Sequence, residues 1–438
     1  ANGMKAYGME NNELPIVNFN IVIEGGHLLD NLDKNGVANL MTDIMMEGTA
    51  NKTPEELEEE IELLGASINM YTGENMIYIG ASTLKRNFSK TMDLIEEILL
   101  EPRWDVEEFD RIKLSTINQI QRNSGQPNTV ASNVYNKLIY GEKHPLAYPS
   151  SGSEESVNSI TIDDLKEFYN KNFSPSISRF HIVGAITQEE VVKELKDLET
   201  RWEAKEVNIP VFELPAARDK AGLYFVDIPN AKQSVINIGN LSIPRTDPDY
   251  YAATVMNYKL GGSFNGNVNL ILREEKGYTY GARSGFSGSK YEGTFTASSS
   301  VRSNVTFESV QIFKDEIEKY RNGIADEDLE FTKNALINGN ARRFETNYAM
   351  LGMLQTMSAY DLPADYIKKE EEVVRTMTIE NHKDLANKYL NPATMIYLVV
   401  GDAATQFGRF EGAGFDEVLL LDKEAQPVEK PIIINTSK

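Results

Sequence analysis

The 438-residue chain contains no cysteine, which excludes disulfides, thiolate metal sites and cysteine nucleophiles. Histidine is also scarce, and no two of the four histidines lie at metal-ligand spacing: His27, His144, His181 and His382. We therefore expect each histidine to be a surface or packing residue. No apolar run approaches the roughly 18 residues that a membrane-spanning helix needs. The sequence therefore predicts no membrane span.

Basic residues are outnumbered as well: the chain has 44 Lys and Arg and 66 Asp and Glu, which gives a net charge of −22. Such a surface repels phosphate backbones and anionic lipids, so we expect neither nucleic acid nor membrane surfaces as partners. The compartment is not fixed by these features, although we favour the bacterial periplasm over the cytoplasm. No signal peptide is visible and the chain begins at Ala1, which is consistent with a processed or excised piece of a longer polypeptide.

Residues 36–49 carry the most informative pattern. Five apolar residues recur at helical spacing and predict one buried stripe: Val37, Leu40, Met41, Ile44 and Met45. Asn39, Thr42 and Asp43 fall on another face of the same helix, at i, i+3 and i+4. Three short polar side chains so placed could converge on one point. The alternative is an ordinary half-buried helix with a polar face.

This stretch resembles the zinc-binding helix, His-x-x-Glu-His, of the pitrilysin family of zinc peptidases, which includes insulin-degrading enzyme and the mitochondrial processing peptidase. The chain keeps the small residues of that frame, Gly36, Ala38, Gly48 and Thr49. It places Asn39 and Asp43 where the family has its two histidines, and Thr42 where the family has its glutamate. The glutamate that serves as third ligand in the family falls on Gln119.

These replacements remove the chemistry of the site. Zinc prefers imidazole, thiolate or carboxylate ligands, and the amide of Asn39 is a poor substitute. Asp43 alone would hold zinc weakly, and the hydroxyl of Thr42 is not basic near neutral pH. We therefore predict no cofactor in this chain, and zinc only in the partner that the resemblance implies.

A second pattern recurs along the chain. Thr161–Gly184 is a capped helix, a proline and a strand ending in glycine, and Thr378–Gly401 repeats it at an ungapped offset of 217 residues. The repeat therefore predicts two copies of one domain, with boundaries 1–205 and 221–438 and a linker over 206–220. Hairpin signals such as that in Ser67–Ser82 favour antiparallel pairing. The predicted class is α+β, each domain a mostly antiparallel β-sheet covered by α-helices, as the resemblance also implies.

The second copy contains a glycine-rich stretch, Leu260–Gly266, but no Gly-Lys-Ser/Thr follows it, so a phosphate-binding loop is not indicated. The residues after it resemble the family's arginine–tyrosine segment, with Arg273 and Tyr280 seven residues apart. In the family this pair reaches the zinc site of the first domain and donates hydrogen bonds to the oxyanion. The residues alone leave an alternative: an ion pair of Arg273 with Glu274 or Glu275, and Tyr280 as a packed strand residue.

Residues 69–72 resemble the family's Asn-Ala-x-Thr on the edge strand that pairs with the substrate backbone. The resemblance therefore implies that Asn69 and Thr72 take part in substrate binding. The alternative is a strand that simply packs on the core.

Together these features predict a non-catalytic subunit or half of a pitrilysin-type zinc peptidase. It would bind unfolded peptide and supply Arg273 and Tyr280 to the zinc site of a His-x-x-Glu-His partner, which is either a separate catalytic subunit or an upstream fused half. A structural scaffold subunit, like the core proteins of the respiratory bc1 complex, is the alternative from the non-enzyme class. A self-sufficient metallopeptidase with an unusual site is a third.

Overall fold

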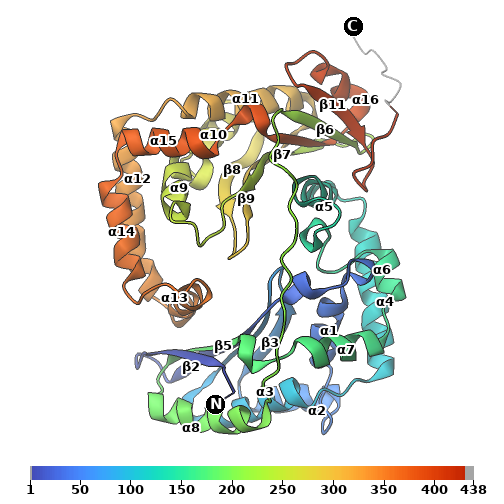
Figure 1. Ribbon diagram of the computed structural model, residues 1–438, viewed down its shortest axis with the longest axis vertical. Helices are drawn as coiled ribbons and strands as arrows, with labels where there is room; N and C mark the ends of the chain where they lie inside the picture. The colour runs from blue at the N-terminus through green and yellow to red at the C-terminus, as the bar shows by residue number, and fades with distance from the viewer. Residues whose placement is uncertain (1, 430–438) are drawn as a thin grey trace. The chain divides into compact units, whose positions relative to one another are not determined.

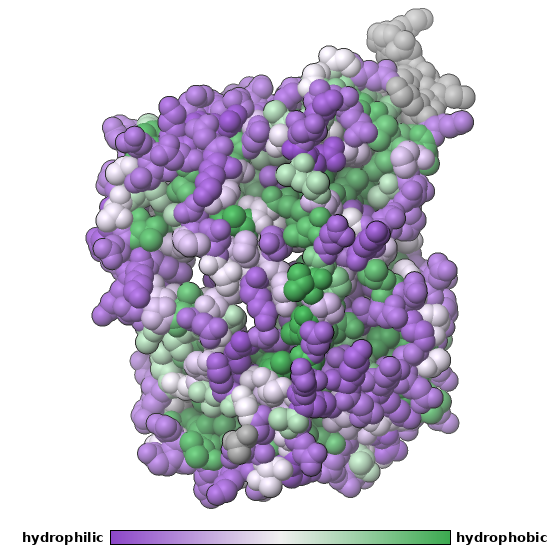
Figure 2. Space-filling view, in the orientation of Figure 1, coloured by the Kyte–Doolittle hydropathy of each residue, from purple (hydrophilic) through white to green (hydrophobic). Residues whose placement is uncertain are grey.

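The computed structural model describes residues 2–429 (Figure 1). The chain forms two compact units, each assembled from three separate stretches. The first unit contains residues up to 122, 143–213 and 340–362, and the second contains 123–142, 214–339 and 363 onward. Among the described residues, no helix is both long and apolar enough to cross a membrane. Hydrophilic residues cover most of the face seen in Figure 2, in keeping with the high net charge.

The first unit is built on a five-stranded sheet in the order β1-β5-β2-β4-β3, in which only β1 and β5 run parallel. Its strands are β1 (Lys5–Glu10), β2 (Ile16–Glu24), β3 (Ser67–Thr72), β4 (Met76–Leu84) and β5 (Ser178–Gly184). Its helices are α1 (Val37–Met45), α2 (Pro54–Leu63), α3 (Phe88–Leu100), α4 (Val106–Asn123), α6 (Glu154–Ser159), α7 (Ile162–Asn172) and α8 (Gln188–Arg201). One face of the sheet packs with α1, α3, α4, α6, α7 and α8 into one apolar core, and α2 packs with α3 in a smaller second cluster.

The second unit repeats this topology and adds one strand, in the order β11-β6-β10-β7-β9-β8. Its strands are β6 (Gly222–Asp227), β7 (Gln233–Ser242), β8 (Thr279–Ser287), β9 (Gly293–Arg302), β10 (Ile396–Gly401) and β11 (Glu417–Leu421). Its helices are α9 (Tyr250–Asn257), α10 (Asn267–Asn269), α11 (Thr306–Tyr320), α12 (Asp326–Gly339), α14 (Tyr366–Thr376), α15 (Ile379–Tyr389) and α16 (Ala403–Gln406). The predicted α+β class, with mostly antiparallel sheets covered by helices, is confirmed.

Helix capping explains where the repeated elements begin. Thr161 and Thr378 start α7 and α15. Each hydroxyl accepts a hydrogen bond from the backbone N–H of the third helical residue, whose side-chain oxygen accepts one from the threonine N–H. Thr53 and Glu56 form a capping box at the start of α2, with Pro54 in the first turn. These local signals are therefore reliable guides to the helix starts.

One helix from each half of the sequence packs with the sheet of the other half. Helix α5 (Pro127–Tyr140) lies against β7 and β10, whereas α13 (Asn347–Ala359) lies against β5, β2 and β1. Gly239 on β7 permits this approach, because a Cβ there would collide with the hydroxyl of Tyr135 and with a neighbouring carbonyl. The two sheets fall on either side of the predicted 206–220 linker. The compact units differ from the predicted domains at two helices, because α5 belongs to the second unit and α13 to the first.

Helix α13 buries polar side chains that the alternating pattern of β2 presents on the side away from the core. Asn18 and Asn20 are buried, and Asn18 accepts a hydrogen bond from Asn347 at 3.2 Å. His181 on β5 lies 2.7 Å from the Asn20 side-chain oxygen and 2.6 Å from the hydroxyl of Ser358. The second face of this sheet is thus covered, but through hydrogen bonds between polar groups.

We expect this polar contact to be acid-sensitive. Burial, together with the charge of Arg179, lowers the pKa of His181 from 6.5 to about 4. The unfolded chain therefore binds more protons between these values, and stability that is fully present above pH 6.5 is lost as pH falls toward 4. Wild type should lose about 2 kcal/mol of unfolding free energy relative to His181→Gln between pH 7 and pH 5. Urea titrations at each pH measure this difference, and parallel pH profiles would show that His181 is not the cause.

Candidate functional site

Helix α1 is held in place by groups that do not depend on a metal. Asp30 accepts hydrogen bonds from the backbone N–H of Gly36 and of Ala38, both at 2.9 Å, and so caps the helix. Gly36 has a φ of 103°, and a Cβ there would lie 2.9 Å from the carbonyl of Ser151. The glycine of the frame is therefore required by chain geometry. The predicted apolar stripe of α1 is buried throughout.

His27 supports this cap from behind. Its Nδ1 lies 3.0 Å from the Asp30 carboxylate, and its Nε2 lies 2.9 Å and 3.1 Å from the carbonyls of Pro145 and Tyr148. Burial alone would lower the pKa of His27, but the hydrogen bond and charge of Asp30 and the two carbonyls raise it overall. Both ring nitrogens face acceptors, which is the arrangement that an imidazolium satisfies.

The polar residues of α1 are hydrogen-bonded to one another and to the backbone. The Asn39 amide donates to the Asp43 carboxylate at 3.1 Å, and the buried hydroxyl of Thr42 donates to the Asn39 carbonyl at 2.8 Å. Burial, followed by the negative charge of Glu47, raises the pKa of Asp43 to about 6. A carboxyl group that resists ionisation and already accepts a hydrogen bond from an amide is a poor cation ligand.

Gln119 lies on α4 with its side chain exposed. No group of three or more His, Asp or Glu side chains within residues 2–429 is arranged to hold a metal ion. The donors present at the four family positions are two amides, one hydroxyl and one carboxyl, and they do not fit a zinc ion. We therefore derive no metal-dependent step in this chain.

The strand that carries Asn69 and Thr72 lies at the end of its sheet. β3 pairs with β4 on one side and, within residues 2–429, forms no ladder on the other. The Asn69 side chain is exposed. Thr72 is buried, and its hydroxyl donates to the Ala38 carbonyl at 2.8 Å and lies 3.2 Å from that of Thr42. Thr72 thus fastens the edge strand to α1, and of the two residues only Asn69 is exposed to solvent.

Tyr280 is exposed at the surface of the second unit, and Arg273 is half-buried. Tyr280, near the start of β8, is 91% exposed, so it is not a packed strand residue. Arg273 lies on the π-helical segment η7 (Leu270–Glu275), with its guanidinium 4.6 Å from the ring centre of Phe264. The alternative ion pair with Glu274 is present, but its 3.5 Å separation is long.

β8 occupies the same position in its sheet as β3 does in the other, yet its outer edge is partly closed. Alternate residues of an edge strand point their backbone groups outward. In β8 three of these groups are bonded to side chains of α9 and α10: the Ala282 N–H to Asn269 at 3.0 Å, the Ser284 carbonyl to Asn257 at 2.9 Å, and the Phe286 carbonyl to Tyr250 at 3.3 Å. Sequence reasoning missed Asn257 and Asn269, which flank the glycine-rich stretch.

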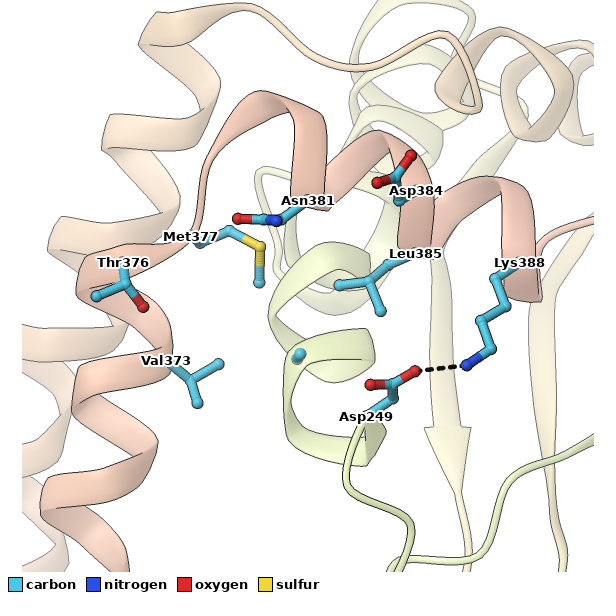
Figure 3. A pocket seen from close by; sticks show the side chains of 9 residues that line it. Asp249, Val373, Thr376, Met377, Asn381, Asp384, Leu385 and Lys388 are labelled. Carbon is cyan, nitrogen blue, oxygen red and sulfur yellow. Dashed lines mark hydrogen bonds and ion pairs between the residues drawn. The ribbon is translucent and has the colours of Figure 1, made fainter.

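A pocket of ≈ 360 Å³ lies in the helical layer of the second unit, between α9, α14 and α15 (Figure 3). Its walls are mainly apolar, and Asp249 forms an ion pair with Lys388 at 2.7 Å across one end. Hydrogen bonds from Lys388 and Tyr389 lower the pKa of Asp249. The charged groups at that end are therefore satisfied by each other, and Arg273 and Tyr280 are not among the pocket's lining residues.

Comparison with known proteins identifies the family. The family model described as insulinase (peptidase family M16) matches residues 9–150, and the model described as the peptidase M16 inactive domain matches residues 159–336. The chain belongs to peptidase family M16. The resemblance seen in the sequence, to the group that contains insulinase and the mitochondrial processing peptidase, is thereby confirmed.

Relatives of this M16 chain include named peptidases and a named non-peptidase. It is 27% identical to a probable mitochondrial-processing peptidase subunit beta of Arabidopsis thaliana, over 61% of this chain and 50% of that protein. It is 21% identical to the non-peptidase homolog YmxG of Helicobacter pylori, over 90% of each. The crystal structure of a peptidase M16 inactive domain from Pseudomonas fluorescens matches with a TM-score of 0.85 and 25% identity, over 92% of this chain and 97% of that one.

We predict that the purified chain does not retain zinc stoichiometrically. Asn39, Thr42 and Gln119 replace two ligands and the base, and Asp43 accepts the Asn39 amide instead of a metal. Elemental analysis after equilibration with zinc and exhaustive dialysis measures the retained metal. A retained ratio near one zinc per chain that Asp43→Ala abolishes would contradict this prediction.

Proposed function

We propose that this chain is the non-catalytic subunit, or half, of an M16 zinc peptidase. It binds unfolded peptide and supplies Arg273 and Tyr280 to the zinc site of a His-x-x-Glu-His partner. The observation that carries the proposal is the contrast between the two sites. The ligand positions on α1 are filled with mutually bonded amide, hydroxyl and carboxyl groups, whereas Tyr280 is 91% exposed and makes no packing contact of the core.

The chemistry of the pair suits this role. A guanidinium and a phenol both donate hydrogen bonds, so both stabilise a developing oxyanion. In the described part of the chain, Arg273 has one acidic neighbour, Glu274, at 3.5 Å, so most of its N–H groups remain available. Residues 2–429 offer no group of metal ligands for the pair to serve, so in this proposal a zinc-bearing partner supplies the rest of the site.

Peptide binding is supported by the two sheet edges. An unfolded peptide can add to an exposed edge as an extra strand through backbone hydrogen bonds that tolerate many sequences. On the outer edge of β8, three backbone groups are already bonded to Asn269, Asn257 and Tyr250. The corresponding edge of β3 carries exposed Asn69, and no ladder covers it in the described residues. We therefore assign peptide addition to β3.

A structural scaffold subunit is the second candidate. It is supported by the fold-level likeness to a chain of complex III from Candida albicans, with a TM-score of 0.74 and 14% identity. The exposure of Tyr280 argues against it, because an aromatic side chain that is 91% exposed contributes nothing to packing.

The two candidates differ in what happens when a partner is added. To find the partner, the coding sequences next to the gene for this chain are searched for His-x-x-Glu-His. The mixture should cleave an unfolded peptide that neither protein cleaves alone. Arg273→Ala and Tyr280→Phe should each lower turnover by a factor on the order of 10²–10³, the usual loss when one oxyanion donor is removed. Quenched-fluorescence peptide assays measure the rate, and gel filtration checks that the complex persists.

Lys276→Ala is the matched control, since Lys276 is an exposed cation that pairs with Glu275 at 2.7 Å on the same segment. It should leave turnover unchanged. Full activity in both the Arg273 and Tyr280 variants would remove the pair from the mechanism and leave the scaffold as the better assignment.

A further inference from the structure

Arg283 is an exposed cation on β8, three residues after Tyr280. Within residues 2–429 its guanidinium forms neither an ion pair nor a hydrogen bond, although the chain has 66 acidic and 44 basic residues. Gly285 lies on the same face two residues further along, and no atom is within 4 Å of the position that a Cβ would take there. The space beside Arg283 is therefore open, and its N–H groups are available to a ligand.

The register of the sheet places two more polar side chains next to this arginine. Arg283 pairs with Ser298 on β9, and Ser298 pairs with Asn237 on β7. Residues directly opposite each other lie on one face of a sheet, with Cβ atoms about 5 Å apart. Neither the Ser298 hydroxyl nor the Asn237 amide is hydrogen-bonded in the part of the chain that the structure describes. We call Arg283, Ser298 and Asn237 the donor row.

The donor row lies on the face of the sheet that is turned away from the core of the second unit. The adjacent residues on the three strands are buried in that core: Ala282, Ala297 and Ile238. Because side chains alternate between the two faces of a strand, the donor row is on the opposite face. Arg283 is exposed there, and Ser298 and Asn237 are half-buried.

Helix α5 bounds the donor row on one side. It lies against β7 and β10, and two of its residues reach β9. The hydroxyl of Tyr135 lies 3.2 Å from that of Thr296, and the hydroxyl of Ser300 donates to the Asn128 side-chain oxygen at 3.4 Å. Thr296 and Ser300 are two residues to either side of Ser298 and share its face. The donor row is therefore walled at its β7 end and open at its β8 end.

The three side chains of the donor row together suit a carboxylate. A guanidinium binds a carboxylate through two parallel N–H···O hydrogen bonds, and a hydroxyl and an amide add further donors to the same group. A cationic ligand would be repelled by Arg283, and an apolar ligand would leave the donors unpaired. One cation does not match a polyanion such as a nucleic acid, which the net charge of −22 also repels.

We propose that the donor row is a carboxylate-binding site, which selects peptides that carry an acidic side chain or a free C-terminus. The inference rests on the proposed function, because the peptide is the ligand, and it adds the chemical group that is recognised. Arg283 supplies the charge, and Ser298 and Asn237 orient the carboxylate by donating to its oxygens. The site lies on the strand of Tyr280, so a bound carboxylate holds the peptide beside that residue.

The experiment uses the full chain and N-acetylated, unstructured peptides of Gly, Ser, Ala and Leu that differ only in their carboxylates. One peptide has an internal Glu and an amidated C-terminus, and a second has Gln and a free C-terminus. The reference peptide has Gln and an amidated C-terminus. Isothermal titration calorimetry at physiological ionic strength, where distant charges are screened, gives each dissociation constant. We expect at least one carboxylate peptide to bind wild type roughly fivefold more tightly than the reference peptide.

Variants of the donor row test its part in this preference. Arg283→Ala should reduce the preference to within about twofold without weakening the binding of the reference peptide. Ser298→Asp places a carboxylate opposite Arg283 and should abolish the preference by pairing with it. Arg86→Ala is the matched control, since Arg86 is an exposed arginine of the first unit, and it should keep the preference.

Circular dichroism and cooperative thermal unfolding check the fold of each variant. Arg283→Lys keeps the charge but not the planar fork, so it should retain only part of the preference. If Ser298→Asp does not fold, Arg283→Ala and Arg283→Lys decide the question, because they alter only an exposed side chain.

The outcomes distinguish this inference from the function on which it rests. A preference that Arg283→Ala removes supports the site, and the peptide that shows it identifies the source of the carboxylate. Equal affinity of wild type for all peptides, or a preference that persists in Arg283→Ala, would overturn the carboxylate site and leave peptide binding by the chain intact. No binding of any peptide by wild type would overturn both the inference and the peptide-binding part of the proposed function.

Discussion

A β-sheet in this protein has two faces to cover, and the helices that follow each strand cover only one of them. The other face is covered by a helix from the opposite half of the sequence, α13 over β2 and β5, and α5 over β7 and β10. This constraint shapes both units. It buries Asn18, Asn20 and His181 beneath α13, and it requires a glycine at position 239 beneath α5. Neither sheet is complete within its own copy of the repeat.

The local features of the fold could be predicted because their causes are local. The capping boxes at Thr53, Thr161 and Thr378 depend on residues three positions apart, and all three form as expected. The alternation in β2 indicates which side chains share a face. It does not reveal that α13, more than 300 residues later in the chain, covers the polar face, because that contact has no counterpart within β2 itself.

The candidate site shows the same division. The positions of the site residues could be predicted from the spacing of Asn39, Thr42 and Asp43, and from the separation of Arg273 and Tyr280. The contacts that these residues make could not be predicted, because the contacts depend on elements distant in the sequence. Thr72 illustrates the difference: the sequence places it on an edge strand, whereas the structure turns its hydroxyl onto the carbonyl of Ala38. The glycine frame of α1 persists because Asp30 and His27 hold the helix, and that support requires no metal.

The partly closed edge of β8 has a consequence for how such a chain behaves toward its own kind. A domain that is present twice presents each of its edges twice, and β3 and β8 are equivalent strands of the two copies. If both were open, one molecule could join two others through them, and such contacts extend without limit into fibrils. Asn257 and Asn269 already occupy two backbone groups of the outer edge of β8, so this edge offers a second molecule fewer free hydrogen-bonding groups than β3 does, and growth through both edges is disfavoured.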